Sequence, residues 1–285
     1  MFGNKGIHAF GTNDPGFSMA MCQAWNDWAH EEFSAHQDRI LPMAQIPTLD
    51  VAAAVAEVQR VAGLGFKGIT IPVKPEYGPT GMDQRNYNQP EFEPLWSAIE
   101  DVDLPLTIHV STGRDPRAAS GPGGAVINYA VHCCAASQEP VANLCASGVL
   151  ERHPKLRFAT IEAGIGWVSW LLEAMDEAFY KHRMWVSPDL KEPPSYYYRR
   201  QAFASFGEDR SGLALGVAHD LIDNFLWAND YPHHEGTWPH SAAAIERTMG
   251  ELTDEQRAKV LGLNAARFWN IQVPARYQEA VQASR

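Results

Sequence analysis

The feature of this chain that most limits its fold is the order in which β-branched runs and helical patterns follow one another. Residues 68–73 read GITIPV and residues 105–110 read PLTIHV, and a segment with helical spacing of apolar residues, 91–102, lies between them. This alternation continues to residue 230 without the Asn-Gly or Asp-Gly pairs that mark tight hairpins. Strands that are joined by helices run parallel, because each helix returns the chain to the edge where it began.

Six segments are expected to be strands, near residues 43, 70, 107, 159, 205 and 227. Six strands would fit a doubly wound sheet, whereas a (β/α)₈ barrel requires eight. Residues 187–200 are rich in Pro and Tyr and are expected to form the longest irregular stretch. Because no repeat and no dividing linker is visible, residues 1–285 are interpreted as a single domain.

Composition restricts the possible partners. The 285 residues include 23 Lys and Arg against 34 Asp and Glu, a formal charge of −11, and no basic block occurs. We therefore expect no nucleic-acid partner and, since no apolar run reaches membrane-spanning length, no membrane partner. The N-terminus lacks the layout of a signal peptide. The four cysteines form no C-x-x-C pair, so they are predicted to be free thiols of a cytoplasmic protein.

Polar side chains stand where three of the expected strands end. His109 ends PLTIHV, Glu162 ends LRFATIE and Asp230 ends NFLWAND. One such residue is usually a cap or a satisfied polar group. Three on different parallel strands would converge on one mouth, as they do in barrels, and His and carboxylates are ligands of divalent metals. The sequence therefore predicts that the three side chains cluster at one face.

The loop YPHHEGTWPHS that follows Asp230 adds further candidates. Of His233 and His234, one is expected to reach the site and the other to face solvent; His233 would contact a metal ligand or the substrate rather than the metal. Glu235 is interpreted as a surface or helix-start residue. Trp238 precedes a proline, which suits the first turn of a helix, and is a candidate for substrate contact.

A second loop, STGRDP, directly follows the strand that ends at His109. The planar fork of Arg114 could bind a substrate carboxylate. A surface ion pair between Arg114 and Asp115 is the other interpretation.

Three longer stretches resemble a known family: PLTIHVSTG, LERHPKLRFATIEAGIGWVSWLLEAMDE and FLWANDYPHHEGTWPHS. They occur in the order found in the amidohydrolase-related family, the second amidohydrolase family, which includes aminocarboxymuconate-semialdehyde decarboxylase-like enzymes. The resemblance covers nearly the whole chain and implies a (β/α)₈ barrel that holds one divalent metal, with zinc first and manganese or iron as alternatives. It also implies a small-molecule substrate and a homodimer. The implied roles are metal ligation by His109 and Asp230, catalysis by Asp230, Glu162 and His233, and substrate binding by Arg114 and Trp238.

Two departures from the family pattern qualify what the resemblance implies. Glu162 stands where decarboxylases of the family carry a catalytic His. The H-x-H or E-x-H pair of the family's first strand is absent. The first recognisable strand here looks like the family's third, so the barrel is expected to be incomplete at its N-terminus and to comprise strands three to eight. Residues 17–33 are expected either to cover an open sheet edge or to pack over outer helices.

The expected function is that of a metal-dependent hydrolase or decarboxylase-like enzyme. Its substrate would be small and either carboxylate-bearing or aromatic. The alternative is a catalytically impaired relative, a pseudoenzyme or truncated form that serves binding or dimerisation. Only His109 and Asp230 are matched to ligand positions, with Glu162 a possible third, so weak or absent metal binding is expected.

Overall fold

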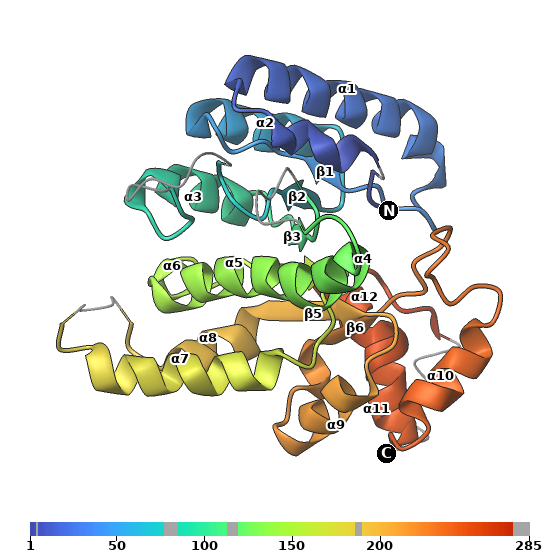
Figure 1. Ribbon diagram of the computed structural model, residues 1–285. Coiled ribbons are helices and arrows are strands. Elements are labelled where there is room, and N and C mark those ends of the chain that lie inside the picture. The colour runs from blue at the N-terminus through green and yellow to red at the C-terminus, as the bar shows by residue number, and fades with distance from the viewer. Residues whose placement is uncertain (4, 77–84, 113–118, 186–189, 276–285) are drawn as a thin grey trace.

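The computed structural model describes residues 1–3, 5–76, 85–112, 119–185 and 190–275, and its centre is a parallel sheet (Figure 1). Six strands pair in the order β1-β2-β3-β4-β5-β6. Each strand therefore lies beside its neighbours in the sequence, as in a barrel, whereas a doubly wound sheet would reverse its order at a switch point. The strands are β1 (Ala44–Gln45), β2 (Ile69–Ile71), β3 (Leu106–His109), β4 (Phe158–Ile161), β5 (Ala202–Phe206) and β6 (Phe225–Trp227).

Helices connect successive strands, and most of them lie against one face of the sheet (Figure 1). Several begin at a side-chain cap of the expected type: Asp14, Asp50 and Asp209 each accept a hydrogen bond from a backbone N–H of the following turn. The α-helices are α1 (Pro15–Phe33), α2 (Val51–Gly63), α3 (Glu93–Asp101), α4 (Gly124–Ile127), α5 (Cys134–Ala146), α6 (Val149–Arg152), α7 (Val168–His182), α8 (Pro194–Gln201), α9 (Arg210–Ala218), α10 (Ser241–Met249), α11 (Asp254–Ala258) and α12 (Asn264–Phe268).

One of these helical regions differs from the sequence prediction. Residues 187–200 were expected to be irregular, but residues 194–200 belong to helix α8, whose Tyr197 and Tyr198 are fully buried. Pro193 and Pro194 mark the start of that helix rather than its absence, since proline is well tolerated in a first helical turn. Two π-helical segments, Asn128–Cys133 and Lys259–Leu263, each join two α-helices of the chain.

The sheet is buried on both faces, as parallel sheets usually are. One face packs against the helices in the main core. The opposite face carries a smaller cluster from β4, β5 and β6 that includes Ile161, Phe203 and Leu226. Phe268 of α12 belongs to this cluster, and Phe2 packs against it from the N-terminal segment. Residues from the two ends of the chain therefore fill the face that lines the inside of a closed barrel.

At each edge of the sheet, a buried asparagine side chain makes hydrogen bonds with backbone groups that have no neighbouring strand. No pairing between β1 and β6 occurs within the described ranges. At β1, Asn26 of α1 accepts from the Gln45 N–H (2.7 Å) and donates to the Gln45 carbonyl (3.0 Å). At β6, Asn264 donates to the Phe225 carbonyl (2.9 Å). Of the two roles expected for residues 17–33, the structure has α1 as the cover of an open edge.

Two smaller expectations can also be compared with the structure. All four cysteines are free thiols, as predicted. No helix among the described residues is both long and apolar enough to cross a bilayer.

Candidate active site

The backbone turns sharply where three of the strands end. Ser111, Glu162 and Asp230 follow β3, β4 and β6, and their φ angles are 61°, 66° and 56°. Such left-handed conformations are costly for residues with a side chain, and they persist where the surrounding structure enforces them, often at functional sites. At Glu162 that support includes Ser205 of β5, whose hydroxyl accepts from the Glu162 N–H at 2.8 Å.

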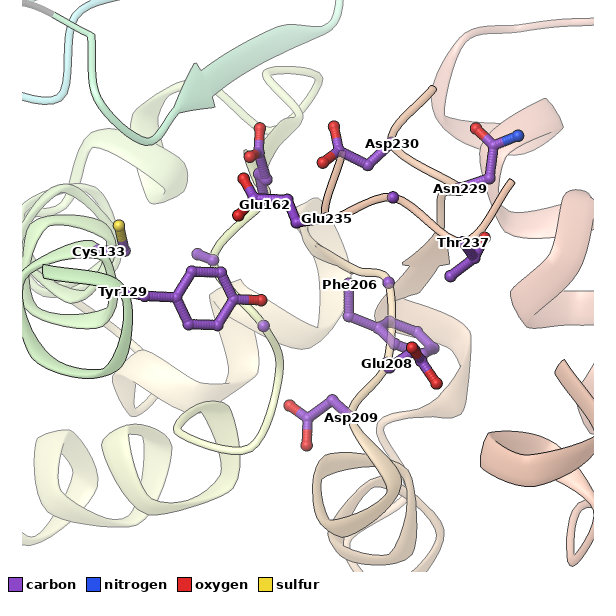
Figure 2. A pocket seen from close by; sticks show the side chains of 14 residues that line it. Tyr129, Cys133, Glu162, Phe206, Glu208, Asp209, Asn229, Asp230, Glu235 and Thr237 are labelled. Carbon is purple, nitrogen blue, oxygen red and sulfur yellow. The ribbon is translucent and has the colours of Figure 1, made fainter. Parts of the chain in front are cut away.

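A cavity of about 290 Å³ opens beside these strand ends (Figure 2). Five carboxylates line it, whereas no Lys or Arg does so in the part of the chain that the structure describes. The lining residues are Tyr129, Cys133, Glu162, Ala163, Gly164, Phe206, Gly207, Glu208, Asp209, Asn229, Asp230, Glu235, Gly236 and Thr237.

The loop 229–237 forms one side of this cavity and is closed upon itself. The Thr237 N–H donates to the Asn229 carbonyl (2.9 Å), and the His233 N–H donates to the Asp230 carbonyl (2.9 Å). Gly236 is required there, since a Cβ at that position would lie 2.7 Å from the carbonyl oxygens of both Asn229 and Asp230. The glycine thus allows one short loop to carry several polar side chains to the same point.

Four side chains could share a cation. Glu162, Asp230, His233 and Glu235 each offer a ligand atom, and these atoms all lie within 4.8 Å of one another. His233 Nδ1 is buried and lies 3.0 Å from Asp230 Oδ1, yet the two atoms do not meet in hydrogen-bond geometry. A nitrogen placed in this way suits a metal better than a direct bond to the carboxylate, so the residues fit a divalent ion.

The charge distribution also affects Asp230. Its burial, together with the negative charge of Glu162, raises the pKa of the Asp230 carboxyl, and His233 offsets only part of the effect. Carboxylate oxygens suit manganese and magnesium, while imidazole suits zinc and iron. A set of three carboxylates and one imidazole is therefore a mixed set of donors for a divalent cation.

His109 reaches this set through Glu162. Its Nδ1 lies 2.6 Å from the Val110 carbonyl, which can only accept, so Nδ1 carries the hydrogen. Its Nε2 lies 2.9 Å from Glu162 Oε2. The lone pairs of His109 Nε2 and Glu162 Oε2 would face each other at this distance unless a proton or a cation lies between the two atoms. A ring nitrogen that donates to a carbonyl is typical of histidines at metal sites. Phe2 packs on the His109 ring with centroids 5.0 Å apart.

Two of the five carboxylates are occupied by the protein itself. Asp209 accepts from the backbone N–H groups of Ile165, Gly166 and Gly212 at 2.7 to 2.8 Å, and so joins the loop after β4 to helix α9. Glu208 pairs with Arg247. Only Glu162, Asp230 and Glu235 remain to hold a cation, which places the reactive part of the cavity at the ends of β4 and β6.

The structure brings His109, Glu162 and Asp230 to one end of the sheet, as the sequence predicts, although His109 stands outside the four-residue donor set. His233 joins the set and His234 is exposed, which matches the expectation that only one of the two reaches the site. The catalytic and metal-binding roles of these residues remain predictions.

The two substrate-binding candidates have different outcomes. Trp238 is 61% exposed, packs edge-on against Tyr231 at 5.2 Å, and is not among the residues that line the cavity. Arg114 lies outside the described residues, so its role remains a prediction.

Sequence reasoning missed most of the residues that line the cavity, and Glu235, Tyr129 and Cys133 are three examples. Glu235 is exposed, as interpreted, but its carboxylate also points into the cavity (Figure 2). The glycine that follows it is the one local signal of the tight loop. Tyr129 and Cys133 come from the helical region before α5, and nothing in their own segment distinguishes them from surface residues. Weak metal binding was expected because only two residues had been matched to ligand positions. The structure offers four candidate donors, so that reason no longer holds.

Comparisons with known proteins find related sequences and a shared fold. A gamma-resorcylate decarboxylase of Rhizobium sp. (strain MTP-10005) is 26% identical over 273 residues, which cover 86% of this chain and 75% of that protein. The crystal structure of 5-carboxyvanillate decarboxylase LigW from Sphingomonas paucimobilis superposes with a TM-score of 0.73 at 23% identity, covering 95% of this chain and 77% of that one.

A third relative has a metal in its structure. The dihydroxybenzoic acid decarboxylase from Polaromonas sp. JS666, with bound manganese and the inhibitor 2-nitroresorcinol, superposes with a TM-score of 0.73 at 17% identity, covering 95% of this chain and 81% of that one. These structural neighbours share the fold of a parallel barrel. The family model described as Amidohydrolase (Amidohydro_2) matches residues 2–271, and the chain therefore belongs to this amidohydrolase family.

Proposed function

We propose that this chain is a divalent-metal-dependent decarboxylase of a small hydroxylated aromatic acid. The observation that carries the proposal is the donor set of Glu162, Asp230, His233 and Glu235 in a cavity at the strand ends. The relatives named as decarboxylases of gamma-resorcylate and 5-carboxyvanillate support the choice of reaction and of substrate class. Manganese in one of the related structures supports the choice of metal.

The four donor residues divide into ligands for the cation and one group that moves a proton. Glu162, His233 and Glu235 would hold the cation, which matches the three protein ligands typical of catalytic metal sites. The cation would supply positive charge that binds the substrate carboxylate and an adjacent phenolic oxygen. In a cavity with five carboxylates, the substrate anion has no other positive partner among the described lining residues. His109 orients Glu162 by facing its Oε2 at 2.9 Å.

Asp230 is the group best suited to move the proton. In the chain without a cation, burial and the negative charge of Glu162 raise the pKa of its carboxyl, which favours the form that carries a proton. Its carboxyl donates that proton to the ring carbon that bears the substrate carboxylate. The bond between this carbon and the carboxylate then breaks, its electron pair restores the aromatic ring, and CO₂ leaves. Asp230 remains as a carboxylate and regains a proton from solvent.

A hydrolase is the second candidate, and Glu162 favours it. The resemblance places a catalytic His at this position in decarboxylases, whereas here a carboxylate occupies it beside His109. In a hydrolase, the same cation would activate water, and Asp230 would accept the proton as the water attacks an amide or ester.

The test combines metal binding with product analysis. Calorimetric titration of the metal-free chain with Mn²⁺ should show one site, and Glu162→Gln or Glu235→Gln should weaken its affinity at least about tenfold because each removes a ligand. With Mn²⁺ bound, 2,6-dihydroxybenzoate should yield CO₂ and resorcinol in equal amounts. Asp230→Asn should retain the metal but lose about 100-fold to 10,000-fold in kcat.

Glu208→Gln is the matched control, because that carboxylate lines the cavity but pairs with Arg247. It should leave Mn²⁺ affinity unchanged. A chain that binds no Mn²⁺, or that binds it and hydrolyses aryl esters without releasing CO₂ from any benzoate tested, would show that the decarboxylase assignment is wrong.

A further inference from the structure

A helical wall stands opposite the carboxylates of the cavity. Helices α4 and α5 are joined by the π-helical segment Asn128–Cys133, and the first and last parts of this segment supply Tyr129 and Cys133 to the lining. Figure 2 shows the Tyr129 ring extending from this helix into the space between Glu162 and Glu235 on one side and Asp209 on the other. A π-helical turn inside a longer helix is often found at a functional site, which makes Tyr129 and Cys133 candidates for contact with a ligand.

The Tyr129 hydroxyl is a hydrogen-bond donor without a protein acceptor. Across the described ranges it makes no hydrogen bond, and the residue is 68% exposed, so a bound ligand could cover it. A tyrosine hydroxyl ordinarily loses its proton only near about pH 10. The hydroxyl therefore keeps its proton near neutral pH and is available to donate.

The other neutral side chains of the cavity are less suited to this task. The Thr237 hydroxyl lies 3.0 Å from the Ser241 hydroxyl and shares a hydrogen bond with it. The Asn229 side-chain oxygen accepts from the Tyr231 N–H at 3.1 Å. A cysteine thiol such as that of Cys133 is a weak donor.

We propose that Tyr129 is a specificity-determining residue, whose hydroxyl donates a hydrogen bond to a neutral oxygen substituent on the ring of the bound aromatic acid. The inference rests on the proposed function, in which the substrate carboxylate lies at the cation held by Glu162, His233 and Glu235. The substituent is a hydroxyl or an ether oxygen on the part of the ring that points away from the metal. A cavity of about 290 Å³ has room for one substituted ring.

The charges around Tyr129 exclude an anionic substituent. A second carboxylate on that part of the ring would lie on the side of the cavity that Asp209 lines, and no Lys or Arg of the described lining would balance its charge. A neutral hydroxyl avoids this repulsion and accepts from Tyr129. The site therefore selects hydroxylated monocarboxylates over dicarboxylates.

The experiment compares three probes on the manganese-loaded protein. Dissociation constants of 4-hydroxybenzoate, benzoate and benzene-1,4-dicarboxylate are measured by calorimetry for the native chain and for Tyr129→Phe. The native chain should bind 4-hydroxybenzoate about three to ten times more tightly than benzoate, the gain expected of one hydrogen bond. The dicarboxylate should bind most weakly. In Tyr129→Phe the preference for 4-hydroxybenzoate should vanish, while benzoate affinity stays the same.

Two controls make the outcomes separable. Tyr180→Phe, an exposed tyrosine on α7 that does not line the cavity, should retain the preference of the native chain. Unchanged Mn²⁺ affinity of Tyr129→Phe shows that the variant is folded and that its donor set is intact. If Tyr129→Phe keeps the preference, or the native chain shows none, the role of Tyr129 is wrong although the proposed function stands. If none of the three benzoates binds the loaded native chain, both proposals are wrong.

Discussion

Replacing Asn26 should reveal how the open sheet is stabilised at its first edge. The side chain is fully buried, and its amide makes three hydrogen bonds: two to the backbone of Gln45, at 2.7 and 3.0 Å, and one to Glu57 Oε1, at 2.7 Å. In Asn26→Ala, the N–H and the carbonyl of Gln45 lose their partner at an edge where no strand follows. Glu57 retains Arg60 and Gln23, so its loss is smaller.

The expected cost follows from these contacts. A buried backbone group without a partner costs about 1–3 kcal/mol, so the two groups of Gln45 together cost about 4 kcal/mol. Native proteins are stable by only about 5–15 kcal/mol, so the change is large. At about 2–4 °C per kcal/mol for a chain of this size, the melting temperature should fall by about 10 °C.

Urea unfolding followed by tryptophan fluorescence measures the free energy of unfolding, with the slope against urea as a check of two-state behaviour. Gln23→Ala is the matched control. Its side chain is on the same helix and donates only to Glu57, at 3.1 Å, so its loss should cost below about 1 kcal/mol. Asn26→Asp keeps the acceptor for the Gln45 N–H but places a carboxylate against Glu57, so it should be at least as unstable as Asn26→Ala. A loss below about 1 kcal/mol in Asn26→Ala would refute the account of the edge.

Four further outcomes follow from the site. Folding raises the pKa of Asp230 above the value of 3.8 for a free aspartate, so ionised Asp230 destabilises the folded chain, and this penalty appears as the pH rises through the folded pKa. In the presence of a chelator, Asp230→Asn removes the penalty and should raise the melting temperature near neutral pH. The variant should lose this advantage below about pH 3.8. Asp209→Ala, which frees three backbone N–H groups, should lower the free energy of unfolding by about 3 kcal/mol or more in a urea titration. Gly236→Ala should weaken Mn²⁺ binding by at least about tenfold in calorimetry, because the added Cβ forces the loop apart. Thiol titration should find Cys133 and Cys134 reactive in the native chain and all four cysteines reactive after denaturation.

The strands could be predicted from the sequence, because each strand of a parallel sheet is buried on both faces and reads as a continuous apolar run. The site residues that end such runs, His109, Glu162 and Asp230, could be found for the same reason. Helix α8 could not, since its prolines are equally common in loops. Sequence alone therefore locates residues whose position follows from the strand pattern, but not those whose position depends on capping or on a turn.

Glu235 and Tyr129 show a second limit. Glu235 reaches the cavity because Asp230 has a φ of 56° and the loop after it is folded back on Gly236, a conformation that no residue type specifies by itself. Tyr129 reaches the cavity because a segment about a hundred residues earlier in the sequence lies beside that loop (Figure 2). Contacts of this kind depend on tertiary packing, which local periodicity does not contain.

The location of the donor set bears on whether the metal site needs a closed barrel. Three of the four donors, Asp230, His233 and Glu235, belong to one short loop that is closed by its own backbone hydrogen bonds. The fourth, Glu162, follows β4 inside the sheet and is held by Ser205 of β5, whereas the loop that carries the other three follows β6, one of the two open edges. Because this loop is closed by its own hydrogen bonds and Glu162 is held by a neighbouring strand, the four donors come together although the sheet is open. Four candidate donors are therefore present without the H-x-H or E-x-H pair of the family's first strand, and Mn²⁺ titration of this chain tests whether they suffice.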